Sequence, residues 1–232
     1  MRLDKFLVNT HIGSRKEVKK YCKEGLVKVN DITAKKSDIL IDENKDLVTF
    51  KGEPIIYREH LYLMMNKPKG VICATEDSFH KTVVDLLNPD MGKFNLFPVG
   101  RLDKDTEGLL ILTNDGEITH NLLSPNKKIP KTYYLESEKD IEDQDITKFK
   151  EGLDLGDFVT QPASFEKIDN RSGYLTITEG KFHQVKRMLQ ATCNKVLYLK
   201  RVSMAGITLD GSLNPGDYRE LTAEEIQIIK DL

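Results

Sequence analysis

The most constraining feature of this 232-residue chain is a charged turn that leads directly into a short, wholly apolar run. Residues 100–108 begin and end with glycine and contain a single apolar side chain. Residues 109–112 have the length and composition of a fully buried strand, and the Thr-Asn-Asp-Gly sequence after them favours a turn. Polar loops at the mouths of buried strands often carry catalytic side chains, so Asp103 is the first candidate for chemistry. The alternative, from these residues alone, is a tight turn in which Asp103 and Arg101 form a surface ion pair.

The overall composition is that of a soluble globular protein with a substantial core. Hydrophobic residues make up 39% of the chain and charged residues 31%. The sequence contains no apolar run long enough to span a membrane and no apolar segment at its N-terminus, so a cytoplasmic location is expected. The 3 cysteines are far apart and fit neither a disulfide framework nor a zinc pattern, so we expect no metal site.

Charge is distributed unevenly along the chain. The formal net charge is only -2, but the first 36 residues hold 10 Lys or Arg against 4 Asp or Glu. Residues 61–232 hold 22 basic against 27 acidic side chains. This asymmetry predicts a basic module attached to a nearly neutral body.

The basic segment has the pattern of a small unit of helices and strands. Apolar spacing predicts a short helix over residues 2–9, and a Ser-x-x-Glu capping box at Ser14 opens a second helix that ends near Gly25. Residues 26–30 and 46–51 are expected strands. Besides Arg2, the candidate RNA-binding residues here are the cations of the second helix, Arg15, Lys16, Lys19, Lys20 and Lys23.

A basic helix face is often simply solvated, so these cations need further support. The order helix, Gly, basic helix, Gly, Leu-Val-x-Val-Asn and a Lys-Lys pair resembles the small RNA-binding fold named after ribosomal protein S-four. The resemblance implies that residues 1–58 bind RNA. Cations along one helix face would follow phosphates and add affinity without reading bases.

The remainder, residues 59–232, is predicted to be a second domain of the α+β class with a mixed, largely antiparallel sheet. Residues 53–60 contain a proline and lack periodicity, so they are the expected linker. Strands are expected at 61–66, 71–74, 131–136, 163–169, 174–178, 196–199 and 206–209, and helices at 82–87, 116–123, 182–192 and after a Thr222–Glu225 capping box.

The charged turn and its strand resemble the G-R-L-D-x-x-T-x-G-L-L motif of bacterial pseudouridine synthases of the RsuA (ribosomal small-subunit) type. The resemblance is continuous over the second domain and implies that Asp103 is the catalytic carboxylate. The sequence Lys-Thr-Tyr at 131–133 resembles the second family motif, which implies that Tyr133 packs against the target uracil. Residues 179–188 resemble the third motif, which implies that Lys186 pairs with Asp103 and keeps it charged, where the wider family usually has arginine.

Other polar residues of these motifs are interpreted without a catalytic role. Arg101 and Arg187 are candidate RNA-binding residues, and a surface ion pair is the alternative for Arg187. His183 is not assigned to the chemistry, because a helix-start histidine bonded to the backbone explains it equally well. The Asn-Lys-Pro-x-Gly sequence at 66–70 resembles the opening family motif and is interpreted as a turn.

The resemblance implies isomerisation of one uridine to pseudouridine in 16S ribosomal RNA, without a cofactor. The expected partner is small-subunit ribosomal RNA within an assembly intermediate, and the expected state is a monomer. A large-subunit substrate is the nearest alternative, and a non-catalytic ribosome-assembly factor is another. A nucleoside glycosidase would need a second carboxylate near Asp103, for which Asp105 is the candidate. Whether Asp103 attacks sugar or base, or acts as a base, is left open.

Overall fold

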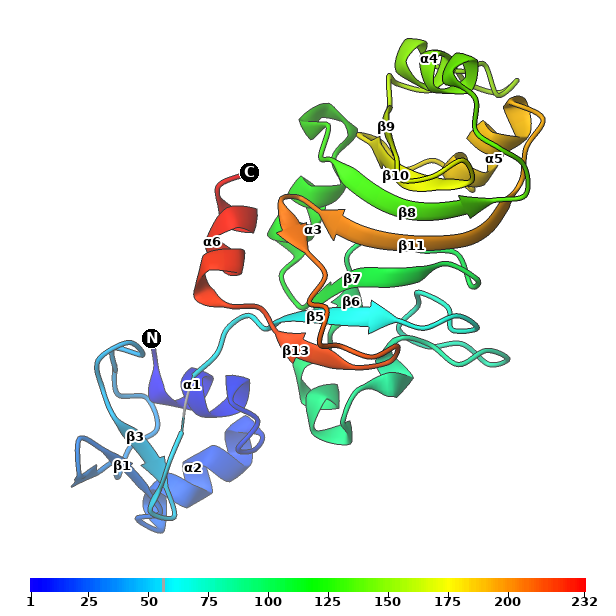
Figure 1. Ribbon diagram of the computed structural model, residues 1–232. Helices are drawn as coiled ribbons and strands as arrows, with labels where there is room; N and C mark the ends of the chain where they lie inside the picture. Colours follow the sequence, from blue (N-terminus) through cyan, green and yellow to red (C-terminus); the bar gives the residue numbers. More distant parts are fainter. Residues whose placement is uncertain (56) are drawn as a thin grey trace. The chain divides into compact units, whose positions relative to one another are not determined.

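The computed structural model describes residues 1–55 and 57–232 and divides the chain into two compact units, Met1–His60 and Leu61–Leu232 (Figure 1). The division falls two residues after the boundary expected from the sequence. Ile56, which belongs to the expected linker, lies outside the described residues. Part of that linker is not a linker at all, because β4 (Glu53–Pro54) pairs with β3 (Val48–Phe50). An edge strand tolerates proline, which has no N–H to donate, so Pro54 does not end the sheet.

The N-terminal unit combines two helices with a four-stranded sheet in the order β2-β1-β3-β4. Its other elements are α1 (Leu3–Asn9), α2 (Arg15–Lys23), β1 (Val27–Val29) and β2 (Ile32–Thr33). The predicted capping box is confirmed: the Ser14 hydroxyl accepts from the Glu17 N–H, and the Glu17 carboxylate accepts from the Ser14 N–H at 2.8 Å. α2 buries Val18 and Cys22 in the core of this unit, so its cations are left on the exposed side.

The C-terminal unit is built on a nine-stranded sheet with the path β13-β5-β7-β11-β8-β10-β9. Its strands are β5 (Tyr62–Lys67), β6 (Phe97–Pro98), β7 (Glu107–Thr113), β8 (Lys131–Ser137), β9 (Ser164–Lys167), β10 (Ser172–Ile177), β11 (Val196–Met204), β12 (Ile207–Thr208) and β13 (Tyr218–Glu220). Every residue of this unit is described, and β7 with β11 is its one parallel pair. The predicted α+β class with a mixed, largely antiparallel sheet is therefore confirmed.

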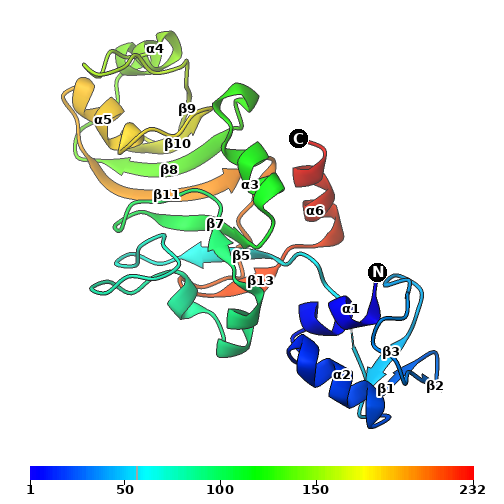
Figure 2. The same ribbon diagram turned by 180° about the vertical axis from the view of Figure 1, so that it is seen from behind.

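Helices cover different parts of this sheet (Figures 1 and 2). They are α3 (Gly116–Leu123), α4 (Asp143–Glu151), α5 (Gln184–Ala191) and α6 (Ala223–Lys230), with single 3-10 segments η1 (Val84–Leu86), η2 (Pro89–Phe94) and η3 (Pro125–Lys127). Side chains of α4 and α5 pack into one core with β8 and β10, and those of α3 and α6 pack into another with β5 and β7. The cap predicted at Thr222 and Glu225 is present at the start of α6.

Two expected elements of this unit are wrong. Residues 71–74 form no strand but only an isolated bridge, in which Ile72 pairs with Thr82. A short apolar run of this kind does not separate a strand from an extended loop. The helix expected at 82–87 is one 3-10 turn, because Leu87 is already extended and the chain then reaches Asn88-Pro89, where a helix is disfavoured.

Candidate active site

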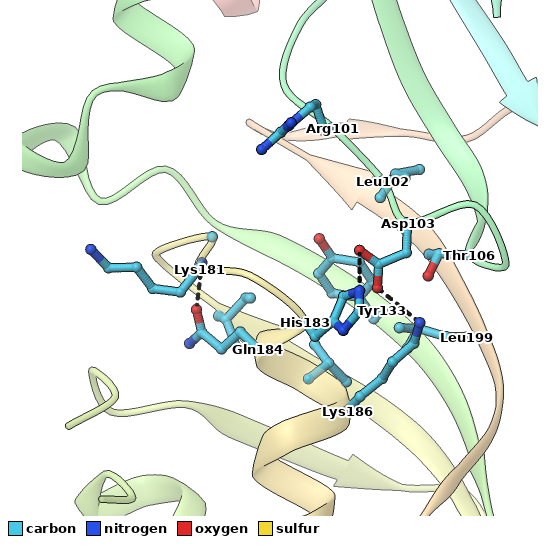
Figure 3. A pocket seen from close by; sticks show the side chains of 13 residues that line it. Arg101, Leu102, Asp103, Thr106, Tyr133, Lys181, His183, Gln184, Lys186 and Leu199 are labelled. Atoms are coloured by element: carbon cyan, nitrogen blue, oxygen red, sulfur yellow. Dashed lines mark hydrogen bonds and ion pairs between the residues drawn. The ribbon is translucent and has the colours of Figure 1, made fainter. Parts of the chain in front are cut away.

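A pocket lies where the loop before β7 meets β8, β11 and the start of α5 (Figure 3). It is lined by Arg101, Leu102, Asp103, Thr106, Tyr133, Ile177, Gly180, Lys181, His183, Gln184, Val185, Lys186 and Leu199. The structure thus brings together the three side chains selected from separate sequence motifs, Asp103, Tyr133 and Lys186. Apolar side chains supply part of the wall, so a base bound here would be shielded from water.

An ion pair joins Asp103 to Lys186, with 2.8 Å between Oδ2 and Nζ. The same ammonium donates to Asp105 Oδ1 at 2.6 Å, so it bridges two carboxylates. Burial by itself would lower the pKa of Lys186, but these hydrogen bonds outweigh it and the pKa is raised. The hydrogen bond from Lys186 lowers the pKa of Asp105. A lysine suits this position because its three N–H donors are not held in a planar fork and can serve two acceptors in different directions.

His183 faces the Asp103 carboxylate, which the sequence did not predict. Its Nε2 lies 3.5 Å from Asp103 Oδ1. The residue occupies the N-cap position of α5 but makes no side-chain cap hydrogen bond, so the alternative of a helix-start histidine that caps the helix is not what the structure has. Its backbone is left-handed, with φ 50°, which turns the ring toward the carboxylate instead.

Tyr133 reaches the pocket because side chains alternate along β8. Tyr133 is 8% exposed and lines the pocket, whereas Tyr134 lies on the other face of the sheet and packs edge-on against Tyr174 and Tyr198. Successive side chains of a strand point to opposite faces of the sheet, so only one of the two tyrosines can point into a given cleft.

Lys67 is the buried residue whose importance the sequence analysis missed. It ends the apolar strand β5, has 0% exposure, and its Nζ donates to the carbonyl oxygens of Pro68 (3.1 Å), Asp103 (3.1 Å) and Thr106 (2.9 Å). Burial lowers the pKa of Lys67. The loop is also held by the Leu102 N–H, which donates to Cys73 Sγ at 3.2 Å. A lysine that directly continues an apolar strand was the signal that could have revealed this role.

Replacement of Lys67 by methionine is expected to reduce catalysis at this pocket about 100-fold while the protein still folds. Three loop carbonyls would lose their donor, and a displacement of about 1 Å in a catalytic group can reduce a rate by about this factor. Turnover and thermal unfolding would be measured together. Lys69→Met, on the same turn but exposed, is the matched control. Equal activities of the two variants would contradict a positioning role for Lys67.

The other candidate cations differ in their surroundings. Arg187 forms an ion pair with Asp157 and donates to the Leu155 carbonyl, so the structure has the surface ion pair that was the alternative to RNA binding. Arg2 makes a bidentate contact with Asp4. Arg101 is exposed and lines the pocket, as does Lys181, which the sequence did not select. Both side chains point away from Asp103 (Figure 3).

Other kinds of site were considered for the residues that the structure describes, 1–55 and 57–232. They contain no group of three or more His, Cys, Asp or Glu side chains placed to hold a metal ion. None of their helices is long and apolar enough to cross a membrane.

Comparisons with known proteins agree with the geometry. Residues 61–191 match the family model of RNA pseudouridylate synthases, and residues 1–46 match the S4 domain. The RNA pseudouridine synthase YtzG of Bacillus subtilis (strain 168) is 52% identical, over 100% of this chain and 99% of that protein. The ribosomal small subunit pseudouridine synthase A of Vibrio cholerae is 42% identical, over 99% of each chain. A crystal structure of a pseudouridylate synthase, 35% identical, superposes with a TM-score of 0.71 over 99% of each chain. The chain therefore belongs to the RNA pseudouridine synthases, with an S4 domain over its first 46 residues.

Proposed function

We propose that this protein converts one uridine of 16S ribosomal RNA, in the small subunit, to pseudouridine, with Asp103 as the catalytic carboxylate. The observation that carries the proposal is the Asp103–Lys186 ion pair in a pocket that Tyr133 also lines. The substrate is supported by relatives named as ribosomal small subunit pseudouridine synthases, which align over nearly the full chain.

The reaction breaks the bond between ribose C1′ and uracil N1 and forms a bond between C1′ and C5. The C5 proton is then removed and N1 gains a proton, so atoms balance and no electrons are transferred to a partner. A carboxylate can act as a nucleophile at sugar or base, or can take a proton from the sugar. In our proposal Asp103 is that carboxylate, and Lys186 supplies the positive charge beside it.

Tyr133 is the proposed contact for the target uracil. The uridine must leave its stack to reach Asp103, which costs roughly a few kcal/mol. Stacking on an aromatic side chain contributes roughly 1–3 kcal/mol per base, so Tyr133 would offset part of that cost. Leu102, Val185 and Leu199 would exclude water around the bound base.

Asp105 is proposed to position Lys186 and not to take part in the chemistry. The glycosidase alternative needs a second carboxylate that handles protons near the first. The hydrogen bond from Lys186 favours the charged form of Asp105, so Asp105 is a poor general acid, and its Oδ1 is already bound to the Lys186 ammonium. Its proposed role is to help hold the Lys186 ammonium in place.

The exposed cations of α2 are the proposed phosphate contacts of the N-terminal unit. Replacement of Lys19, Lys20 and Lys23 together by Gln is expected to weaken RNA binding and to reduce the slope of log affinity against log salt by about 2–3, since each lost phosphate contact removes about 0.7–0.9. Binding would be measured between about 50 and 200 mM salt, because the affinity of proteins for nucleic acid changes strongly over this range. Lys230→Gln, on α6, is the control, and an unchanged slope in the triple variant would contradict the assignment.

The proposed partner is ribosomal RNA in an assembly intermediate, and the proposed active form is a monomer. A target nucleotide that must be unstacked is more accessible before the subunit is complete.

The test is tritium release from RNA labelled at uracil C5. Small-subunit ribosomal RNA, large-subunit ribosomal RNA and assembly intermediates of each would be incubated with the protein. Release from small-subunit RNA alone supports the proposal. Release from large-subunit RNA alone moves the substrate to the other subunit. Tight binding with no release from any RNA would favour a non-catalytic assembly factor.

A further inference from the structure

The exposed Phe182 stacks on the half-buried His183 of the pocket wall, and packing does not explain why this phenyl ring is in solvent. Phe182 is 72% exposed. Its ring stacks on the His183 imidazole, with centroids 3.8 Å apart and 20° between the planes. Lys181 and His183, the neighbours of Phe182 in the chain, both line the pocket. The phenyl ring therefore lies beside the pocket but not in its lining, with most of its surface open to solvent.

The backbone at this pair is in a conformation that non-glycine residues rarely adopt. His183 has φ 50° and ψ 28°, in the left-handed region, which is unfavourable for a side chain with a Cβ. Strain of this kind is commonly retained at functional sites. Here it accompanies an imidazole that faces Asp103 and a phenyl ring that stays outside the core.

The His183 imidazole lies between the Asp103 carboxylate and the Phe182 ring. His183 Nε2 is 3.5 Å from Asp103 Oδ1, and the phenyl ring is stacked on the imidazole. A flat group on the open face of Phe182 would be separated from the Asp103 carboxylate by two stacked rings, so it would belong to a nucleotide next to the one in the pocket. The exposed cations Arg101 and Lys181 line the same pocket and could meet phosphates there.

We propose that Phe182, supported by His183, is a subsite for a nucleobase adjacent to the target uridine in the RNA strand. The inference rests on the proposed function and extends it. When the target uridine leaves its stack, the adjacent base loses a stacking partner, and an exposed aromatic ring can replace it. Because every base has a flat face, this subsite accepts any base and holds the strand in position without reading its sequence.

The kinetic test compares Phe182→Ala and Phe182→Tyr on an RNA fragment that the wild type modifies. Loss of one base-stacking contact predicts that Phe182→Ala lowers kcat/KM about 10- to 100-fold. Phe182→Tyr keeps the ring and is expected to remain within about threefold of the wild type. Ile168→Ala, at another exposed apolar residue of the same unit, is the matched control and should be unaffected.

A second substrate separates stacking from a structural effect. The fragment would be made with an abasic nucleotide on the 5′ or the 3′ side of the target. On one of these RNAs, kcat/KM of the wild type should fall by about the factor that Phe182→Ala causes on intact RNA. For Phe182→Ala itself, kcat/KM should be the same on that abasic RNA as on intact RNA. If Phe182→Ala lowered kcat/KM relative to the wild type by the same factor on intact RNA and on both abasic RNAs, the subsite would be overturned. It would also be overturned if Phe182→Ala did not lower kcat/KM on intact RNA.

A fluorescence measurement detects the contact between Phe182 and the adjacent base without requiring turnover. With 2-aminopurine at the flanking position, binding to the wild type or to Asp103→Asn should quench emission, and binding to Phe182→Ala should not. An active wild type without quenching at either flank overturns the subsite alone. A wild type that forms no pseudouridine in any RNA overturns the proposed function itself, and the subsite with it.

Discussion

Asp103→Asn is expected to abolish pseudouridine formation, with a fall in rate of roughly 10⁴-fold or more. Asparagine has nearly the same shape but is neither a nucleophile nor a base, so the groups around it stay while the chemistry is lost. It also removes the negative charge that faces Lys186 Nζ at 2.8 Å and His183 Nε2 at 3.5 Å. The measurement is tritium release under single-turnover conditions, which reports the chemical step.

RNA binding by this variant should be nearly unchanged. Asp103 is an acidic residue in a protein that binds a polyanion, so its removal does not take away an attractive contact. Asp105→Asn is the matched control, because it removes the other carboxylate on Lys186 and keeps Asp103. We expect this control to retain most of its activity. If Asp105→Asn were inactive and Asp103→Asn active, the two assignments would have to be exchanged. Loss of binding without loss of chemistry would remove Asp103 from the mechanism.

Gly108→Ala is expected to destabilise the C-terminal unit by at least about 4 kcal/mol, since overpacking and backbone strain act together. Gly108 has φ 102°, where residues with a Cβ are strained. A Cβ built there would lie 2.2 Å from the Arg201 carbonyl oxygen and 2.8 Å from the Arg201 nitrogen. Both are backbone atoms of β11, so no side chain can rotate away to make room. The alanine would push apart the parallel pair of β7 and β11, in which Gly108 is opposite Arg201.

The effect should appear as a fall of about 10 °C or more in the thermal midpoint, or as failure to accumulate folded protein. Gly116→Ala is the matched control. A Cβ at Gly116 meets nothing within 4 Å, and the residue begins α3, where alanine is favoured. Its midpoint should stay the same or rise slightly. A midpoint for Gly108→Ala within about 2 °C of the wild type would show that β11 can move to admit the methyl group.

Local pattern was enough to predict much of this fold from the sequence. A capping box needs two residues three apart, so the starts of α2 and α6 were predictable from Ser14 and Thr222. The apolar run at 109–112 indicated the buried strand β7, and alternation along β8 separated Tyr133 from Tyr134. The pattern failed at 71–74 and 82–87, where short segments carry too few residues for a period to be defined.

For the site, the sequence by itself determined which motifs to inspect, and with the family resemblance it selected Asp103, Tyr133 and Lys186. The resemblance also implied the contact of Lys186 with Asp103, and only the tertiary structure decided the other contacts of these motifs. Lys67 donates a hydrogen bond to the Asp103 carbonyl, 36 residues away in the sequence, and Lys186 donates one to Asp105, 81 residues away. Contacts of this kind depend on how distant segments meet at the ends of neighbouring strands, and no local period or spacing encodes them. For the same reason a lysine interpreted as part of a turn became the internal support of the loop that carries Asp103.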